Sequence, residues 1–493
     1  MADYRRRRPD LRLRCLPMRW LMRTAILAAI SSRPAQAAEP LEPAAALNDF
    51  RLPPGYRIEL AAAEPNVVDP VAIAFDDQGR LWVVEMRDYP TLPAGKAPSS
   101  RIRILEDRDG DGRYESAQTF AEGLLFPTGL QLWGSGAFVT LAGEVAYFPD
   151  DDYDGRADRK ETWYEGFATL NEQLRANHPT LGADGWIYVA GGLRGGQIKS
   201  HRRSGDPPLS INGRDFAFNP RTGECRAVSG NGQFGLVIDD FGRRFTCSNR
   251  NPLIQVMIEQ RYLERNPQLV PPSILHDVAA AGIESRLYPR SRALTTSAQH
   301  AGQFTAACGI EVYSSEALPA DARGHAFICE PTANLVHQEA IEPAGAAMTA
   351  RRVEQKSEFL TATDPWFRPV NLCTGPDGAL YVVDMCRAVI EHPEWMTEEL
   401  RDRPDLRDGA DRGRIYRIEA ADDRQAEASD AQQENLRGEL IARLLEHPNS
   451  WHRQLAVRLV LESDDPPLAD LRSLAIESPS PAARSLALAL LQA

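Results

Sequence analysis

The sequence predicts an all-β propeller of about six blades, followed by a small all-α region of HEAT-like repeats. Three observations support this: one hairpin pattern recurs along the chain, glycine and proline are frequent but scattered, and helical periodicity appears only after the last hairpin copy. We expect an export signal over residues 1–37, the propeller over 45–418, a linker over 419–434 and the helical repeats over 435–493.

The recurring pattern is a short apolar run, a turn that often contains Asp-Gly, and a second apolar run. Clear copies span residues 71–84, 181–189, 235–246 and 372–383, and degenerate copies span 127–139 and 323–328. Each copy is typical of the two inner strands of a blade, and a spacing of about 40 to 60 residues leaves room for two outer strands. Six copies therefore predict six blades, with an open β-sandwich as the alternative.

The first 37 residues have the pattern of an export signal. Arg19 and Arg23 precede the apolar run 24–30, and Ala35-Gln36-Ala37 has the small-residue spacing of a cleavage site. A frayed basic tail is the alternative. We expect an exported protein, periplasmic or at the cell surface, with no transmembrane span in the mature chain.

Composition excludes some partners and indicates a redox environment. The net charge of −13 argues against nucleic acid as a partner, because phosphate binding needs a basic surface. Six cysteines follow the signal, and an even set in an exported chain is compatible with disulfides. Cys308 and Cys329 belong to neighbouring β-runs of one blade, so we predict a disulfide between them.

The C-terminal region has the apolar spacing of short helices. The first two helices are separated by a break at 447–450, and Ser450 is the expected N-cap of the second. A second pair covers 468–476 and 481–490, with Ser480-Pro481 opening the last helix. These antiparallel pairs must dock on the propeller, join another chain or belong to a longer array. The apolar positions of the first pair are Leu436, Leu440, Leu444, Trp451, Leu455 and Leu459.

Two acidic segments predict Ca²⁺ sites. In residues 150–161, carboxylates occupy positions 1, 3, 5, 9 and 12 of an EF-hand loop and glycine occupies position 6. Residues 107–118 match this pattern through position 9, but Gln118 stands at position 12. Both segments lie between predicted strands, and solvated acidic turns are the alternative. The predicted ligands are Asp150, Asp152, Asp154, Asp158, Glu161, Asp107, Asp109 and Asp111.

The central channel of the predicted propeller is the expected reaction site, because loops from several blades converge there. His178 directly precedes an inner strand, and it would take the hydroxyl proton of an alcohol substrate. Arginines that flank blade strands would pair with the carboxylates of an anionic quinone. Taken singly, each is alternatively a surface or structural residue. We predict His178, Arg175 and Arg250 as catalytic, and Arg175, Arg250, Arg368 and Arg387 as cofactor-binding.

Several short segments occur together in one known family. With them, residues 50–490 resemble the membrane-bound dehydrogenase domain of PVC-type haem-binding proteins, which is distantly similar to quinoprotein glucose/sorbosone dehydrogenases. The resemblance implies a β-propeller with oxidoreductase chemistry. Family members commonly continue into a cytochrome c domain. The segments are LPPGYRI (52–58), DGWIY (184–188), FTAACG (304–309), CEPTANLVH (329–337), WFRPV (366–370), DMCR (384–387), IEHP (390–393) and GRIYR (413–417).

Two functions follow from these observations. The first is a calcium-dependent quinoprotein-type dehydrogenase that oxidises a sugar or polyol with pyrroloquinoline quinone and passes electrons to a separate cytochrome c. The second is a non-catalytic, calcium-stabilised propeller that binds glycans or protein partners. A channel lined by arginine, asparagine and histidine favours the first, whereas a plugged channel with a shallow aromatic-lined face favours the second.

Overall fold

The computed structural model describes residues 39–291, 300–391, 396, 404–421 and 438–493. The predicted export signal and most of the predicted linker lie outside these ranges. No helix among the described residues combines the length and the apolar character needed to cross a membrane.

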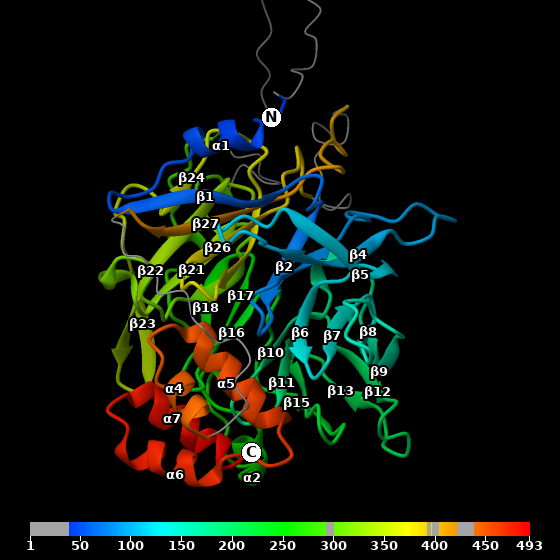
Figure 1. The fold of residues 1–493 in the computed structure, drawn as a ribbon, viewed down its shortest axis with the longest axis vertical. Coiled ribbons are helices and arrows are strands. Elements are labelled where there is room, and N and C mark those ends of the chain that lie inside the picture. Colours follow the sequence, from blue (N-terminus) through cyan, green and yellow to red (C-terminus); the bar gives the residue numbers. More distant parts are fainter. Residues whose placement is uncertain (1–38, 292–299, 392–395, 397–403, 422–437) are drawn as a thin grey trace, which may run out of the picture. The chain divides into compact units, whose positions relative to one another are not determined.

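Six antiparallel sheets form a six-bladed propeller (Figure 1). The innermost strand of each sheet packs against the innermost strand of the next, in the order β2, β6, β10, β16, β20, β25 and back to β2. This ring confirms the predicted propeller and the count of six blades.

The strands of the blades follow one another along the chain. The first blade comprises β2 (Pro70–Phe75), β3 (Leu81–Glu85), β4 (Ser100–Glu106) and β5 (Ser116–Leu124). The second blade comprises β6 (Gly129–Trp133), β7 (Gly136–Leu141), β8 (Glu144–Phe148) and β9 (Glu161–Phe167). Two further strands, β12 (Gly196–Ser200) and β13 (Leu209–Ser210), extend the second blade. The third comprises β10 (Asn177–Leu181), β11 (Ile187–Ala190), β14 (Asp215–Phe218) and β15 (Cys225–Val228); the fourth comprises β16 (Leu236–Ile238), β17 (Arg244–Ser248), β18 (Asn251–Val256) and β19 (Leu275–Asp277). The fifth comprises β20 (Cys308–Val312), β21 (His325–Glu330), β22 (Leu335–Ala344) and β23 (Ala347–Arg352), with β24 (Leu360–Thr361) beside β22.

The last blade closes the ring with a strand from the other end of the chain. It comprises β25 (Pro369–Thr374), β26 (Leu380–Asp384) and β27 (Arg414–Ala420), and its outermost strand is β1 (Tyr56–Ala63). The pairing places Ile58 opposite Ile418, and β27 continues two residues beyond the predicted propeller end. Hydrogen bonding between the two ends of the propeller therefore holds the circle together. The helix α1 (Pro43–Asp49) precedes β1.

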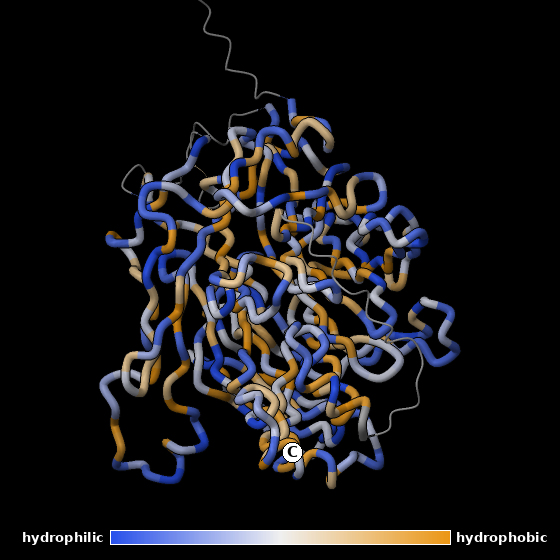
Figure 2. The backbone as a smooth tube through the Cα atoms, turned by 60° about the vertical axis from the view of Figure 1, so that its left-hand side comes forward, coloured by the Kyte–Doolittle hydropathy of each residue, from blue (hydrophilic) through white to orange (hydrophobic). Residues whose placement is uncertain are grey.

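The predicted hairpin copies coincide with inner strands of the blades. In the first copy, the Asp76 carboxylate accepts the backbone N–H groups of Gln78 and Arg80 at 3.0 and 2.9 Å, and Asp239 does the same in the fourth blade. Aspartate thus closes the turn by accepting hydrogen bonds from the backbone. Figure 2 shows that many hydrophobic stretches lie in the interior strands, while hydrophilic stretches are frequent at the outer turns.

The predicted disulfide is corrected by the structure. Cys308 and Cys329 stand directly opposite each other on β20 and β21, as their neighbouring β-runs predicted, and both are buried. Each of the six cysteines in the described part of the chain is a free thiol. Burial raises the pKa of both thiols, and protonated thiols do not undergo exchange, which needs a thiolate.

Four short helices follow the propeller: α4 (Gly438–Leu445), α5 (Ser450–Glu462), α6 (Leu468–Glu477) and α7 (Pro481–Leu490). They pack as two pairs, α4 with α5 and α6 with α7, whereas a HEAT-like repeat stays a prediction. The N-cap of α5 is Asn449 and not the expected Ser450, because the Asn449 side chain accepts the Trp451 N–H at 2.8 Å. Ser480 caps α7 as predicted.

The helices dock on the propeller, which is one of the three arrangements expected from the sequence. The Arg453 guanidinium reaches both carboxylate oxygens of Asp240, at 3.0 and 2.6 Å, and both side chains are buried. The Asn449 amide donates to the carbonyls of Gly375 and Pro376 at 3.0 and 2.9 Å. One end of the channel is therefore covered by α5. We call it the lower end, and the upper end is where the innermost strands begin.

Candidate functional site

His178 lies on β10 near the upper end of the channel. Its Nδ1 is 2.8 Å from Asn177 Oδ1, and the Asn177 amide nitrogen donates to the carbonyls of Arg175 and Gln233. Because Asn177 Oδ1 can only accept, His178 carries its hydrogen on Nδ1 and keeps a lone pair on Nε2. The histidine backbone has a φ of 47°, a left-handed conformation that is rare outside glycine and that clusters at functional sites.

The lone pair of His178 faces the opposite wall of the channel. Nε2 is 3.2 Å from the side-chain nitrogen of Asn371, which also donates to the Val71 carbonyl at 3.1 Å. Asn371 lies on β25, and β10 and β25 are the third and sixth members of the ring of innermost strands. The contact therefore bridges the channel. Burial lowers the pKa of His178 to about 4, so the imidazole is neutral near pH 7.

Two of the predicted cofactor-binding arginines are engaged in internal contacts at the upper end. Arg368 donates to the carbonyls of Arg387, Pro331 and Ala388 at 3.0, 2.8 and 2.7 Å. Arg387 forms a fork with both oxygens of Asp69, at 2.5 and 2.8 Å, and all three charged side chains are buried. Asp69 directly precedes β2, so this ion pair joins the first blade to the last.

The other two predicted arginines keep part of their donor capacity. Arg175 is buried, donates to Glu172 and to the Thr169 carbonyl at 3.1 Å, and stacks over Phe126, while its Nε and Nη1 have no partner among the described residues. Arg250 is half-buried and donates to Gln303 at 2.9 Å, and its Nε has no partner in the same part of the chain.

This arrangement does not fit the quinone cradle that the sequence predicts. A cofactor with several carboxylates needs arginines whose forks are free to pair with them. Arg368 and Arg387 are committed to backbone carbonyls and to Asp69, and Arg175 is held by Glu172. The predicted role of Arg368 and Arg387 in binding the cofactor is therefore not favoured by their contacts, and no chemical step is assigned to a quinone.

The first acidic loop joins β8 to β9 in the second blade. Carboxylate oxygens of Asp150, Asp152 and Asp158 lie within 4.8 Å of one another. Burial, and to a smaller extent the charges of Asp154 and Asp152, raises the pKa of Asp150. Two predicted ligands are outside this group: Asp154 accepts the Arg156 N–H at 2.8 Å, and Glu161 accepts from Arg159 at 2.9 Å.

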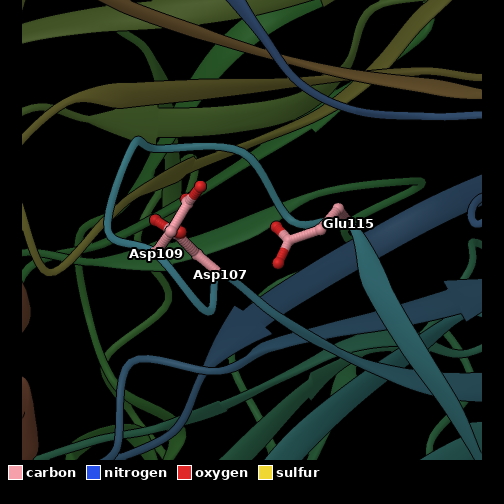
Figure 3. A group of neighbouring side chains, drawn as sticks. All are labelled: Asp107, Asp109 and Glu115. Carbon is pink, nitrogen blue, oxygen red and sulfur yellow. The ribbon is translucent and has the colours of Figure 1, made fainter.

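The second acidic loop joins β4 to β5 in the first blade. Asp107, Asp109 and Glu115 bring carboxylate oxygens within 4.8 Å of one another and turn toward the same loop interior (Figure 3). Asp111 is outside this group, and its carboxylate accepts the backbone N–H of Arg113 at 2.8 Å. Gln118 stands at position 12, where the EF-hand pattern has a carboxylate, and its side-chain amide donates to the Asp154 carbonyl of the first loop at 2.7 Å. The residue at position 12 thus links the two loops.

The structure adds three residues that the predicted sites omitted. Asn371 meets His178 across the channel, Glu115 joins the second carboxylate group, and Gln118 connects the loops. Glu115 stands at position 9 of its loop, so the spacing alone could have identified it. Asn371 lies within the last inner strand, between the segment WFRPV and the hairpin copy 372–383, and only the closed ring brings it to His178.

A family model described as "Domain of unknown function (DUF7133)" matches residues 42–422, which is most of the chain. The chain belongs to this family. The description of the DUF7133 family names no activity, so the resemblance to PVC-type dehydrogenase domains stays a prediction. No curated protein sequence matches the chain.

Solved structures similar to this DUF7133 chain include several carbohydrate-active proteins. The PQQ domain of pyranose dehydrogenase from Coprinopsis cinerea is 11% identical, with a TM-score of 0.42 and coverage of 75% of this chain and 97% of that one. Aldose sugar dehydrogenase from Escherichia coli is 14% identical, with a TM-score of 0.41 and coverage of 74% and 99%. A calcium structure of a Trichoderma reesei protein of carbohydrate-active family AA12 is 12% identical, with a TM-score of 0.40 and coverage of 79% and 100%. TM-scores of this size carry no inference about site residues, so each residue is assigned from its own contacts.

Proposed function

We propose that this chain is an exported, calcium-stabilised dehydrogenase of a sugar or polyol, with its reaction site at the upper end of the channel. The observation that carries the proposal is the lone pair of neutral His178 on the channel axis. A neutral imidazole with a fixed tautomer can accept the hydroxyl proton of an alcohol, and a polar ligand in the channel would raise its basicity by relieving the desolvation that lowers its pKa. The left-handed backbone at His178 supports a functional role for this position.

The residues around His178 fix the orientation of its ring and can position a substrate beside it. Asn177 holds Nδ1–H, so the proton of the substrate would arrive at Nε2, where Asn371 now donates. A substrate hydroxyl that enters the channel would replace the Asn371 amide as the group bonded to Nε2. Arg250 is half-buried and keeps an unpartnered N–H among the described residues, so it could bond a second polar group of the ligand.

The oxidation also needs a hydride acceptor. The sequence predicts pyrroloquinoline quinone in this role and a separate cytochrome c as the next electron acceptor, and both stay predictions. The occupied forks of Arg368 and Arg387 do not favour the quinone, so the cofactor must be identified by experiment.

Calcium belongs to the proposal as a structural ion. The two carboxylate groups fit a hard cation, because ionised carboxylates accept only and repel one another without a positive charge. Gln118 joins the two loops, so binding in one loop would stiffen the hairpins of two neighbouring blades.

The test is dye-linked oxidation of a panel of sugars and polyols by the purified chain, with and without added quinone and Ca²⁺. His178→Ala should lower turnover by about 100-fold or more, since general base catalysis contributes that much. The matched control is His276→Ala, because His276 is exposed on the outermost strand β19 and should leave turnover unchanged. Oxidation that survives His178→Ala contradicts the proposal.

A non-catalytic propeller is the second candidate. The His178–Asn371 bridge and the occupied arginines favour it, because they resemble a plugged channel. The same assay separates the two candidates. Calcium binding without oxidation of any sugar or polyol, with or without quinone, would establish the second.

A further inference from the structure

Two adjoining cavities lie where the helices cover the lower end of the channel. The first has a volume of about 250 Å³ and is lined by all six innermost strands and by α5. The second, which we call the lower cleft, has a volume of about 410 Å³ and lies between the third and fourth blades and α7. Both cavities are lined by Leu181, Ile238, Asp239, Asp240 and Gln454. The lower cleft is large enough for a small ligand, and it lies at the opposite end of the channel from His178.

The acidic side chains of the lower cleft are already paired within the protein. None of these side-chain carboxylates is free to attract a cation. Arg244 keeps Nε and Nη1 without a partner among the described residues, so the cleft also holds buried donors that can bond a ligand oxygen. Arg261 lines the cleft as well, but it is exposed and stacks on Tyr262. The pairs are Asp240 with Arg453 at 2.6 Å, Asp239 with Arg243 at 2.6 Å, Glu259 with Arg244 at 3.1 Å, and Asp184 with the Tyr188 hydroxyl at 2.7 Å.

Neutral polar groups in the cleft keep their hydrogen-bonding capacity. Asn219 accepts the backbone N–H groups of Arg221 and Thr222 at 2.9 and 3.0 Å, and its side-chain NH₂ donates to no group in the described part of the chain. The side chains of Gln454 and Ser485 also line the cleft and make no hydrogen bond to the described residues. Amide and hydroxyl groups both donate and accept, so they match a ligand that carries several hydroxyls.

Aromatic side chains provide the apolar part of the cleft. Phe241 is 50% exposed, and Trp186 is half-buried with one face covered by the Arg226 guanidinium at 3.8 Å. Tyr188 also lines the cleft, but it is buried and the Arg244 guanidinium lies over its ring at 4.6 Å. Aromatic rings offer a large, rigid surface against which the C–H face of a sugar ring can pack.

We propose that the lower cleft binds a neutral saccharide. Paired carboxylates, free amides and hydroxyls, and aromatic surface together match a ring that has hydroxyls around its edge and an apolar face. The site is independent of the proposed oxidation, because His178 does not line it. A saccharide bound in the lower cleft would anchor the protein to a glycan, or it would be the end by which a longer glycan is held on the protein.

The experiment is an array of neutral gluco-, manno- and xylo-oligosaccharides and their uronic acid counterparts, probed with the full chain. Calorimetry with the retained neutral glycan then measures Kd for variants of the cleft and for control variants. Gln454→Leu keeps the side-chain size, and Asn219→Asp keeps the oxygen that closes the turn while removing the NH₂ donor. The matched control is Asn212→Asp, since the Asn212 oxygen accepts the Gly196 N–H at 3.2 Å outside the cleft.

We expect at least one neutral glycan to be retained, and acidic counterparts to bind more weakly. Gln454→Leu and Asn219→Asp should each raise Kd by about tenfold, the loss expected for one hydrogen bond, while Asn212→Asp and His178→Ala leave Kd unchanged. Trp186→Ala should also weaken binding. No retained neutral glycan, or a glycan that binds both cleft variants like the unaltered chain, overturns the proposal. Neither result depends on whether the chain oxidises sugars.

Discussion

The upper and lower ends of the channel use buried arginine in similar ways but leave different groups free. At the upper end, Arg387 pairs with Asp69 and joins the first and last blades, and His178 is left as a neutral base on the channel axis. At the lower end, Arg453 pairs with Asp240 and joins α5 to the fourth blade, and neutral amides remain beside aromatic rings. Most charged side chains at both ends therefore hold the architecture, and most of the groups that stay free for function are uncharged.

The largest effect is expected from Arg387→Leu. This change leaves Asp69, whose side chain is fully buried, without its counter-ion. An unpaired buried charge costs about 3 to 5 kcal/mol, so the free energy of unfolding should fall by that amount. Chemical unfolding measures it, with Arg351→Leu as the control, because Arg351 is exposed and pairs with an exposed glutamate. A loss below about 1 kcal/mol would mean that the pair does not close the ring.

Removal of Ca²⁺ should have the second-largest effect on stability. At a Ca²⁺ concentration about 100 times Kd, one bound ion stabilises the folded chain by about 3 kcal/mol, so a chelator should lower Tm. Asp150→Asn should abolish most of this shift. Asp151→Asn should not, because Asp151 stands outside the carboxylate group and pairs with Arg159. An unchanged Tm in chelator would reduce both loops to acidic turns.

Arg453→Leu should have a smaller and more local effect. Arg453 donates to Asp240 and to the Ser314 carbonyl. Without Arg453, Asp240 still accepts the Ser314 hydroxyl at 2.8 Å, so the loss is that of charge-assisted hydrogen bonds, about 1.5 to 3 kcal/mol. We expect proteolysis to cut α5 to α7 before the propeller. The Arg453→Leu substitution should also weaken glycan binding at the lower cleft, and it should leave the turnover that depends on His178 unchanged. If the helices and the propeller of the Arg453→Leu variant resist the protease equally, the prediction of a local effect is wrong.

The smallest effect is a pH dependence of stability. Burial lowers the His178 pKa to about 4, while an unfolded histidine titrates near 6.5. Between these values the unfolded chain takes up a proton that the folded chain does not, so this contribution to stability is lost as pH falls below about 6.5. Urea unfolding at pH 7 and pH 5 should show that the unaltered chain loses about 1 to 2 kcal/mol more than His178→Gln. Identical losses would mean that His178 is protonated in the folded chain.

The propeller could be predicted because its signal is local and repeated. Each turn aspartate, such as Asp76 or Asp239, acts on backbone groups within four residues, so every hairpin copy is complete in the sequence. The closure by β1 could not be read this way, because its partner β27 lies more than 350 residues away and carries no turn signal.

The candidate site was predicted in part. The carboxylates at positions 1 and 3 of each acidic loop do converge, since they are close in sequence. The contacts of Arg368 and Arg387 could not be predicted, because Arg368 donates to backbone carbonyls that carry no side-chain signal and Arg387 pairs with Asp69 of the first blade. A flanking arginine therefore looks alike in the sequence whether it binds a ligand or joins two blades.

Chemical rescue of His178→Gly tests the central claim most directly. Glycine tolerates the left-handed backbone at this position and leaves a space the size of an imidazole. If His178 accepts the substrate proton, the dye-linked turnover of the variant should fall by about 100-fold, and added imidazole should restore part of it with saturation. Undiminished turnover, or a loss that imidazole does not restore while Tm and Ca²⁺ binding are unchanged, would contradict a catalytic role for His178.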